Sequence, residues 1–181
     1  MISSIINAAS RGDITYTQFV PAGWLDWGLA NGFLGFDVKT RKARLVDNGA
    51  HKATGCTEPF IAEAVVSMLK QPPSETENKK IQIAEVEYSG KELLACFEEE
   101  TGTKWEVENI TPPELLEIAE KARVGNNARL RTVSITLFLN FGGSGAGYFP
   151  HALSSLVEGS TYQRKTLKQI VKDAVGKAQA S

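Results

Sequence analysis

The spacing of apolar residues predicts three internal helices. In residues 57–69, apolar side chains recur every three or four positions after a threonine cap, an early acid and a proline in the first turn. Residues 89–92 form a capping box that opens a second helix, which Gly102 ends. A third helix begins by the same logic at Thr111, and Leu116 is among the residues expected on its buried side.

The two ends of the chain also show helical patterns. Residues 2–9 place isoleucines on one side of a short helix, with Gly12 as a plausible stop. Residues 161–178 predict an amphipathic C-terminal helix whose last residues fray. The apolar run at 131–141 fits a helix or a strand by period alone, and we favour a helix.

Several shorter segments are typical of strands. Residues 14–20 are rich in β-branched and aromatic side chains and are closed by Pro21. Residues 36–52 predict short antiparallel strands around a turn, and 81–86 and 105–110 each predict one more strand. The chain is therefore expected to be α/β, or α+β as it stands, with little sheet at its start.

Composition narrows the class of protein. At 181 residues, 1–181 suits a single domain, and 42% hydrophobic with 23% charged residues is typical of a globular chain. No apolar run approaches the roughly 20 residues that cross a bilayer, so we expect no membrane partner. A net charge of −1 gives no field to attract nucleic acid, so we expect none as a partner and no polyanionic substrate.

The thiols and the N-terminus indicate a cytoplasmic protein. Cys56 and Cys96 are forty positions apart, which fits reduced thiols better than a disulfide framework, and no signal peptide is evident. His51 and Cys56 have no third ligand at a sensible spacing, so no metal site is expected. Cys96, within a predicted helix, is most simply a small buried hydrophobe.

Two stretches resemble a known family. TYTQFVPAGWLDWGLANGFLGFDVKTRKARLVDNGAHKATGCT, residues 15–57, and ENKKIQIAEVEYSGKELLACFEEETGTKWEV, residues 77–107, are similar to fungal NmrA-like, isoflavone-reductase-like proteins. The resemblance implies an atypical short-chain dehydrogenase, in which an N-terminal Rossmann half binds NADP(H) and a smaller C-terminal half closes over the substrate. It maps onto the C-terminal portion alone: a late Rossmann strand at 14–20, a substrate-side region at 21–150 and the C-terminal helix.

The signatures of the dinucleotide half are not found. No strand, glycine-rich turn and helix precede residue 14, and the glycine cluster at 141–149 does not fit G-x-G-x-x-G, so it is expected to be a flexible loop. Tyr88 and Tyr162 each have a lysine three positions on, whereas the family's Tyr-x-x-x-Lys pair needs four. Whether this chain is an enzyme by itself is therefore uncertain, and it is not expected to bind NADP(H) tightly.

The resemblance also implies a site. Pro21 and Gly23 would lie near the nicotinamide if the other half were supplied. The substrate side would be lined by aromatic side chains, namely Trp24, Trp27, Phe33 and Phe36. For the two tryptophans, core packing is an equal alternative. No catalytic residue is assigned, because Asp26 and Asp37 are more simply solvated loop acids than general acids or bases.

Three functions remain open at this point. The leading one is the substrate-binding portion of an NAD(P)H-dependent oxidoreductase that acts on a small organic molecule and is not redox-competent alone. One alternative is a cofactor-free binding or regulatory module, and another is a non-redox enzyme of secondary metabolism that uses the same pocket. Because a strand taken from a parallel sheet exposes an unpaired edge, we also expect self-association.

Overall fold

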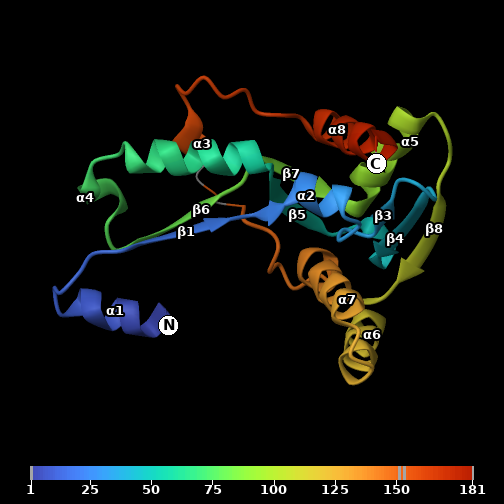
Figure 1. Ribbon diagram of the computed structural model, residues 1–181, viewed down its shortest axis with the longest axis horizontal. Coiled ribbons are helices and arrows are strands. Elements are labelled where there is room, and N and C mark those ends of the chain that lie inside the picture. The colour runs from blue at the N-terminus through green and yellow to red at the C-terminus, as the bar shows by residue number, and fades with distance from the viewer. Residues whose placement is uncertain (1, 151, 153, 181) are drawn as a thin grey trace.

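The computed structural model describes residues 2–150, 152 and 154–180. This part of the chain forms an elongated α/β molecule with its N-terminal helix at one end (Figure 1). The helices are α1 (Ile2–Ser10), α2 (Leu25–Ala30), α3 (Glu58–Leu69), α4 (Pro73–Thr76), α5 (Gly90–Thr101), α6 (Pro112–Val124), α7 (Ala128–Phe141) and α8 (Leu167–Ala180), with 3-10 turns η1 (Asp47–Gly49) and η2 (Ser154–Val157). The strands are β1 (Thr17–Pro21), β2 (Gly23–Trp24), β3 (Phe36–Asp37), β4 (Lys42–Val46), β5 (Lys52–Cys56), β6 (Lys79–Ile83), β7 (Val86–Ser89) and β8 (Glu106–Ile110).

The described strands form three small sheets. β1 pairs in parallel with β6. β5 lies between β2, which is parallel to it, and β7, which is antiparallel. β4 lies between antiparallel β3 and parallel β8. The amide of Ala22 donates to the carbonyl of Ile83, and that of Glu85 donates to Gly55, so backbone hydrogen bonds connect the first two sheets.

Two strand predictions were wrong in detail. The strand expected at 81–86 is two strands, β6 and β7, because the chain leaves one sheet after Ile83 and enters another. Of the strands expected at 36–52, β3 and β4 do pair antiparallel, but β5, which follows the turn, lies in a different sheet. Asp47, Asn48 and Gly49 all have positive φ (46°, 56° and 68°), and this left-handed turn directs the chain away from β4.

The helix signals were more reliable. The Thr57 hydroxyl accepts from the Phe60 amide and the Ser89 hydroxyl from the Glu92 amide, which confirms the starts of α3 and α5. The run at 131–141 is part of helix α7. The C-terminal helix begins at Leu167, not at residue 161, and continues to Ala180.

One expected core position was also wrong. On α6, Leu115 is fully buried but Leu116 is 43% exposed. Consecutive residues on a helix lie about 100° apart, so a helix that packs by one face buries only one of such a pair.

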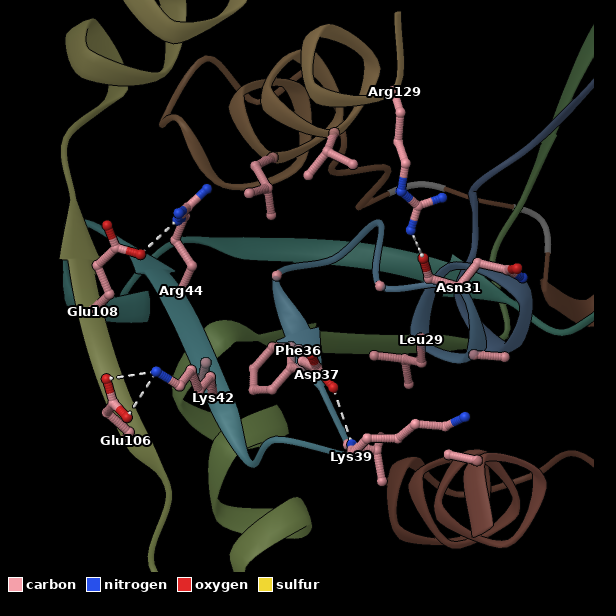
Figure 2. A pocket seen from close by; sticks show the side chains of 18 residues that line it. Leu29, Asn31, Phe36, Asp37, Lys39, Lys42, Arg44, Glu106, Glu108 and Arg129 are labelled. Atoms are coloured by element: carbon pink, nitrogen blue, oxygen red, sulfur yellow. Dashed lines mark hydrogen bonds and ion pairs between the residues drawn. The ribbon is translucent and has the colours of Figure 1, made fainter. Parts of the chain in front are cut away.

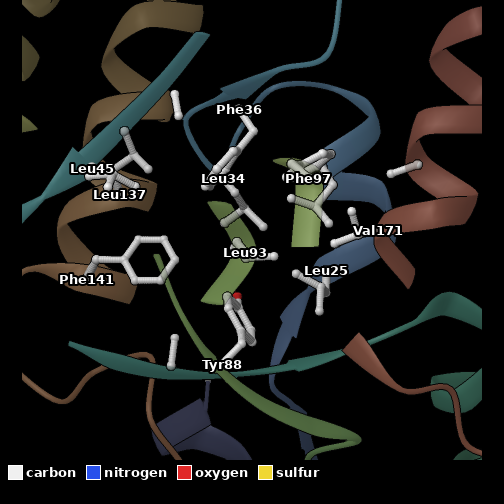
Figure 3. Packing of buried hydrophobic residues seen from close by; sticks show 14 of the residues in the cluster. Leu25, Leu34, Phe36, Leu45, Tyr88, Leu93, Phe97, Leu137, Phe141 and Val171 are labelled. Carbon is white, nitrogen blue, oxygen red and sulfur yellow. The ribbon is translucent and has the colours of Figure 1, made fainter. Parts of the chain in front are cut away.

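Two groups of buried apolar residues hold the elements together. The first, which we call the body core, lies among β4, β5, α2, α5, α7 and α8 (Figure 3). Phe36 stacks on Phe97 with ring centroids 5.0 Å apart, and Phe97 lies 4.8 Å from Trp105. The second, the outer core, lies between α3 and the β1–β6 sheet. It consists of Ala22, Cys56, Phe60, Ala64, Ile81, Ile83, Ala84 and Val157.

Candidate binding groove

The segment after β1 buries aliphatic side chains and exposes aromatic ones. It contains the short strand β2 and helix α2. Leu25 and Leu29, one turn apart on α2, are buried in the body core. Trp24 and Trp27 are 51% and 44% exposed, so neither fills the core. Large aromatic side chains left this exposed beside each other mark a surface available for binding.

These aromatic residues form one wall of a groove of about 490 Å³. The ring of Phe33 lies 4.8 Å from that of Trp27, and together they make a continuous apolar wall. Helix α7 makes the other wall, because every fourth residue from position 132 faces the groove. The lining residues are Gly23, Trp24, Trp27, Gly28, Phe33, Leu34, Thr132, Thr136 and Asn140.

The structure separates the predicted site residues into two sets. Gly23 lines the groove beside the aromatic wall, in β2 opposite Gly55 of β5. Pro21 ends β1 opposite Ile83 and does not line this groove. Phe36 is also apart, because it is 2% exposed and stacks within the body core. The role assigned to each of them stays a prediction.

Arg129 holds the aromatic wall against the start of α7. Its guanidinium donates to the carbonyl oxygen of Asn31 at 2.8 Å, and its Cζ atom lies 5.2 Å from the centre of the Phe33 ring. Both contacts reach from α7 to the chain just after α2, and Figure 2 shows the one to Asn31. Sequence reasoning missed Arg129, because nothing local indicates a partner nearly a hundred positions away.

A second groove, of about 710 Å³, lies over the β3–β4–β8 sheet and is charged (Figure 2). Lys42 pairs with Glu106 at 3.1 Å and Arg44 with Glu108 at 2.8 Å, and both pairs join residues directly opposite each other on β4 and β8. Opposite charges at facing positions stabilise strand pairing. These side chains therefore already have a structural role.

The two candidate acids lie outside the aromatic groove. Asp26 accepts hydrogen bonds from the amides of Trp27, at 2.9 Å, and Glu58, at 3.2 Å, so it occupies the N-terminus of α3. Asp37 accepts from the amides of Lys39 and Thr40 in an exposed turn. Partial burial raises the pKa of Asp37, but the hydrogen bonds from Thr40 and Lys39 outweigh it and hold the pKa below its ordinary value.

A buried carboxylate that the sequence did not reveal lies beside β7. Glu85 is 9% exposed. It accepts hydrogen bonds from the Thr57 amide and hydroxyl at 2.8 and 2.7 Å, from the Tyr162 hydroxyl at 2.8 Å and from the Lys165 amide at 3.0 Å. Burial raises the pKa of Tyr162 to about 12, and the bond to Glu85 adds to the shift. The network ties residues 162–165 to the outer core.

The other tyrosine that precedes a lysine is part of the body core. Tyr88 is fully buried, and its hydroxyl is the one buried side-chain polar atom without a hydrogen bond in the described part of the chain. Burial raises its pKa. Neither Tyr88 nor Tyr162 lines the aromatic groove.

The thiols and the histidine also have structural surroundings. Cys56 is fully buried, and burial raises the pKa of its thiol to about 11, which disfavours the reactive thiolate. His51 Nε2 lies 3.1 Å from an oxygen of Asp47. Among the residues that the structure describes, no three histidine, cysteine, aspartate or glutamate side chains gather as a metal site would require. No described helix has the length and apolar composition to cross a bilayer.

We next compared the sequence of this chain with those of known proteins. No family model matches the chain. Over 115 residues it is 29% identical to the oxidoreductase poxI of Penicillium oxalicum, a match that covers 63% of this chain and 36% of that protein.

Solved structures give a fuller match. An isoflavone reductase superposes with a TM-score of 0.74 at 15% identity, covering 94% of this chain and 56% of that one. AtPrR2, in complex with NADP+ and (+)pinoresinol, superposes with a TM-score of 0.71 at 15% identity, covering 96% of this chain and 55% of that one. The chain thus spans little more than half the length of these structures. It shares the fold of part of an isoflavone reductase and is similar in sequence to part of a fungal oxidoreductase, which confirms the resemblance to NmrA-like, isoflavone-reductase-like proteins.

Proposed function

We propose that this chain is the substrate-binding portion of an NAD(P)H-dependent oxidoreductase, and that the groove between α2 and α7 binds a small, flat, apolar organic molecule. The observation that carries the proposal is the exposed wall of Trp24, Trp27 and Phe33 facing α7. Small-molecule sites are mostly apolar concavities with a few placed polar groups, and this groove has that composition. A cytoplasmic location, inferred from the reduced thiols, is part of the proposal.

The groove can be tested with biphenyl, a flat apolar probe. We expect biphenyl to quench the tryptophan fluorescence with saturation. Phe33→Ala should weaken binding by up to tenfold, which is the worth of about 1.4 kcal/mol of lost ring contact. Val124→Ala, at an exposed position on α6, is the control and should bind as the wild type does. No saturable quenching, or equal binding by Phe33→Ala, contradicts the proposal.

Two observations support placing most of the dinucleotide site outside this chain. The glycine cluster follows the C-terminal end of α7, whereas a phosphate turn must precede a helix N-terminus, where amides and the helix dipole favour anions. A Cβ atom at Gly143 would lie 3.1 Å from the His51 ring, so this loop packs against a side chain. Gly23 and Pro21 alone would contact only a nicotinamide held by other residues.

The cofactor part of the proposal has its own measurement. We expect NADPH titrated into this chain in a calorimeter to give no heat beyond dilution. Micromolar binding would overturn the view that the cofactor is held elsewhere. That result would not contradict the proposal that the groove binds an apolar molecule, because biphenyl binding is measured without cofactor.

The structure bears on the two alternatives. No ionisable side chain lines the groove in the described part of the chain, and Asp26 faces the start of α3 instead. A non-redox enzyme that uses this pocket would need an acid or base there, so the geometry favours binding over catalysis by the groove itself. A cofactor-free binding module therefore remains the second candidate.

Self-association completes the proposal. β1 pairs with β6 on one edge, and no described strand pairs with its other edge. No residue of α1 is buried, and Ile2, Ile5 and Ile6 are 58%, 39% and 44% exposed. An open edge and an uncovered apolar helix favour association with a second chain. Light scattering should give a mass above the 19.7 kDa of one chain that rises with concentration, and a monomer at all concentrations would contradict it.

A further inference from the structure

The amide of Asn140 has a fixed orientation at one end of the groove. Its Nδ2 donates to the carbonyl oxygen of Thr136 at 2.8 Å. A carbonyl can only accept, so the nitrogen must face Thr136 and the oxygen must face the other way. The orientation of this amide therefore follows from its partner.

The Asn140 oxygen faces Gly23. Cβ atoms at Gly23 and Gly147 would lie 3.3 and 3.0 Å from Oδ1 of Asn140, so the oxygen lies between two residues that have no side chain, and the Tyr88 hydroxyl would lie 3.9 Å from the Gly23 Cβ atom. Gly23 does not have a positive φ, so the backbone itself does not require glycine at this position. Of the two glycines only Gly23 lines the groove, so the side on which a side chain is missing at Gly23 is the side from which a ligand could approach the oxygen.

This oxygen is an unused acceptor at the end of an apolar surface. Within the described part of the chain it accepts no hydrogen bond from the protein. The hydroxyl of Thr132, at the other end of the groove, already donates to the carbonyl of Ala128 at 2.9 Å. An acceptor beside apolar walls favours a ligand that brings its own donor.

We infer that Asn140 determines the specificity of the groove by accepting a hydrogen bond from a hydroxyl group at one end of a flat, apolar ligand. The inference rests on the proposed binding function and adds the ligand's chemistry and orientation. Thr132 and Asn140 are eight residues apart on α7, which is about 12 Å of helix and suits a molecule of about two rings. The hydroxyl would lie near Gly23, with the rings against Trp27 and Phe33.

Three biphenyl probes that differ only at one para position test this. 4-Hydroxybiphenyl carries a donor, 4-methoxybiphenyl carries only an acceptor, and biphenyl carries neither. Wild-type protein should bind 4-hydroxybiphenyl about five- to tenfold more tightly than 4-methoxybiphenyl, as expected for one net hydrogen bond. Asn140→Leu should bring that ratio to about one, because no acceptor then remains at this end of the groove.

Arg131→Leu is the matched control, because it removes an exposed polar side chain from α7 at a position that does not line the groove. It should keep the preference for the hydroxyl probe, and circular dichroism of both variants should show an unchanged fold. Equal binding of the two substituted probes by wild-type protein, or loss of the preference in Arg131→Leu instead of Asn140→Leu, overturns the role of Asn140. Failure of all three probes to bind overturns the groove itself, so the two failures are distinguishable.

Discussion

The body core and the outer core are built differently. In the body, Phe36, Phe97 and Trp105 stack inside a shell of helices and strands. In the outer region, α3 covers one face of a two-stranded sheet with a smaller apolar cluster, and the buried carboxylate of Glu85 binds the return segment. Enclosed apolar volume thus stabilises the body, whereas the outer region depends on a polar network and on a sheet that is open at one edge.

Matched phenylalanine truncations test this difference most strongly. Phe97→Ala should lower the free energy of unfolding by about 3 to 5 kcal/mol, because stacked rings on both sides cannot close the cavity. Phe60→Ala should cost less, about 2 to 3 kcal/mol, because an open region can relax around the gap. Urea denaturation followed by circular dichroism measures both. Equal losses would mean that the outer core is as well enclosed as the body.

Removal of the buried carboxylate should come next in size. Glu85→Ala leaves the Thr57 and Lys165 amides without their acceptor, which we expect to cost about 2 kcal/mol. Because the loss is local, trypsin should cut at Arg164 or Lys165 faster than in wild-type protein. Glu77→Ala, at an exposed position before β6, is the control. Unchanged proteolysis of Glu85→Ala would show that the network does not hold this segment.

The sequence predicted the positions of helices better than it predicted which strands and side chains contact each other in the fold. Caps at Thr57 and Ser89 are local, so the starts of α3 and α5 could be predicted from neighbouring residues. Strand pairing is set by residues far apart, which is why the split between β6 and β7 was missed. The same holds for the site, where the exposed tryptophans are close in sequence but Asn140 and Gly23 meet only in the fold.

A substitution at Tyr88, inside the body core, should have a smaller effect on the free energy of unfolding, and the effect should be stabilising. The Tyr88 hydroxyl is buried without a hydrogen bond, so it lacks compensation for the water it lost on folding. Tyr88→Phe should therefore raise the free energy of unfolding by about 1 kcal/mol. Thermal and urea unfolding should agree on the sign. A loss of stability would show that the hydroxyl has a partner in solution and that the body is less purely apolar than its packing indicates.

The smallest expected effect concerns the contact that joins the groove wall to the body. Arg129 is exposed, so Arg129→Met should lower the free energy of unfolding by only about 0.5 to 1 kcal/mol, from one hydrogen bond and one cation–π contact. Its local effect should be larger, because Phe33 would lose the group that holds it beside Trp27. The tryptophan emission should shift to longer wavelength and biphenyl should bind more weakly.

Arg131→Met, two residues further along α7, is the matched control for the loss of charge and helix propensity, and Arg129→Lys separates charge from the planar guanidinium. Arg131→Met should leave both signals unchanged, and Arg129→Lys should restore them only in part, since an ammonium cannot reproduce the stacked geometry. If Arg129→Met leaves the emission and biphenyl affinity at wild-type values, packing of Leu25 and Leu29 into the body core is sufficient to position the wall. The enclosed body core would then position the groove by itself. Polar contacts would be needed to hold chain segments in place only in the outer region.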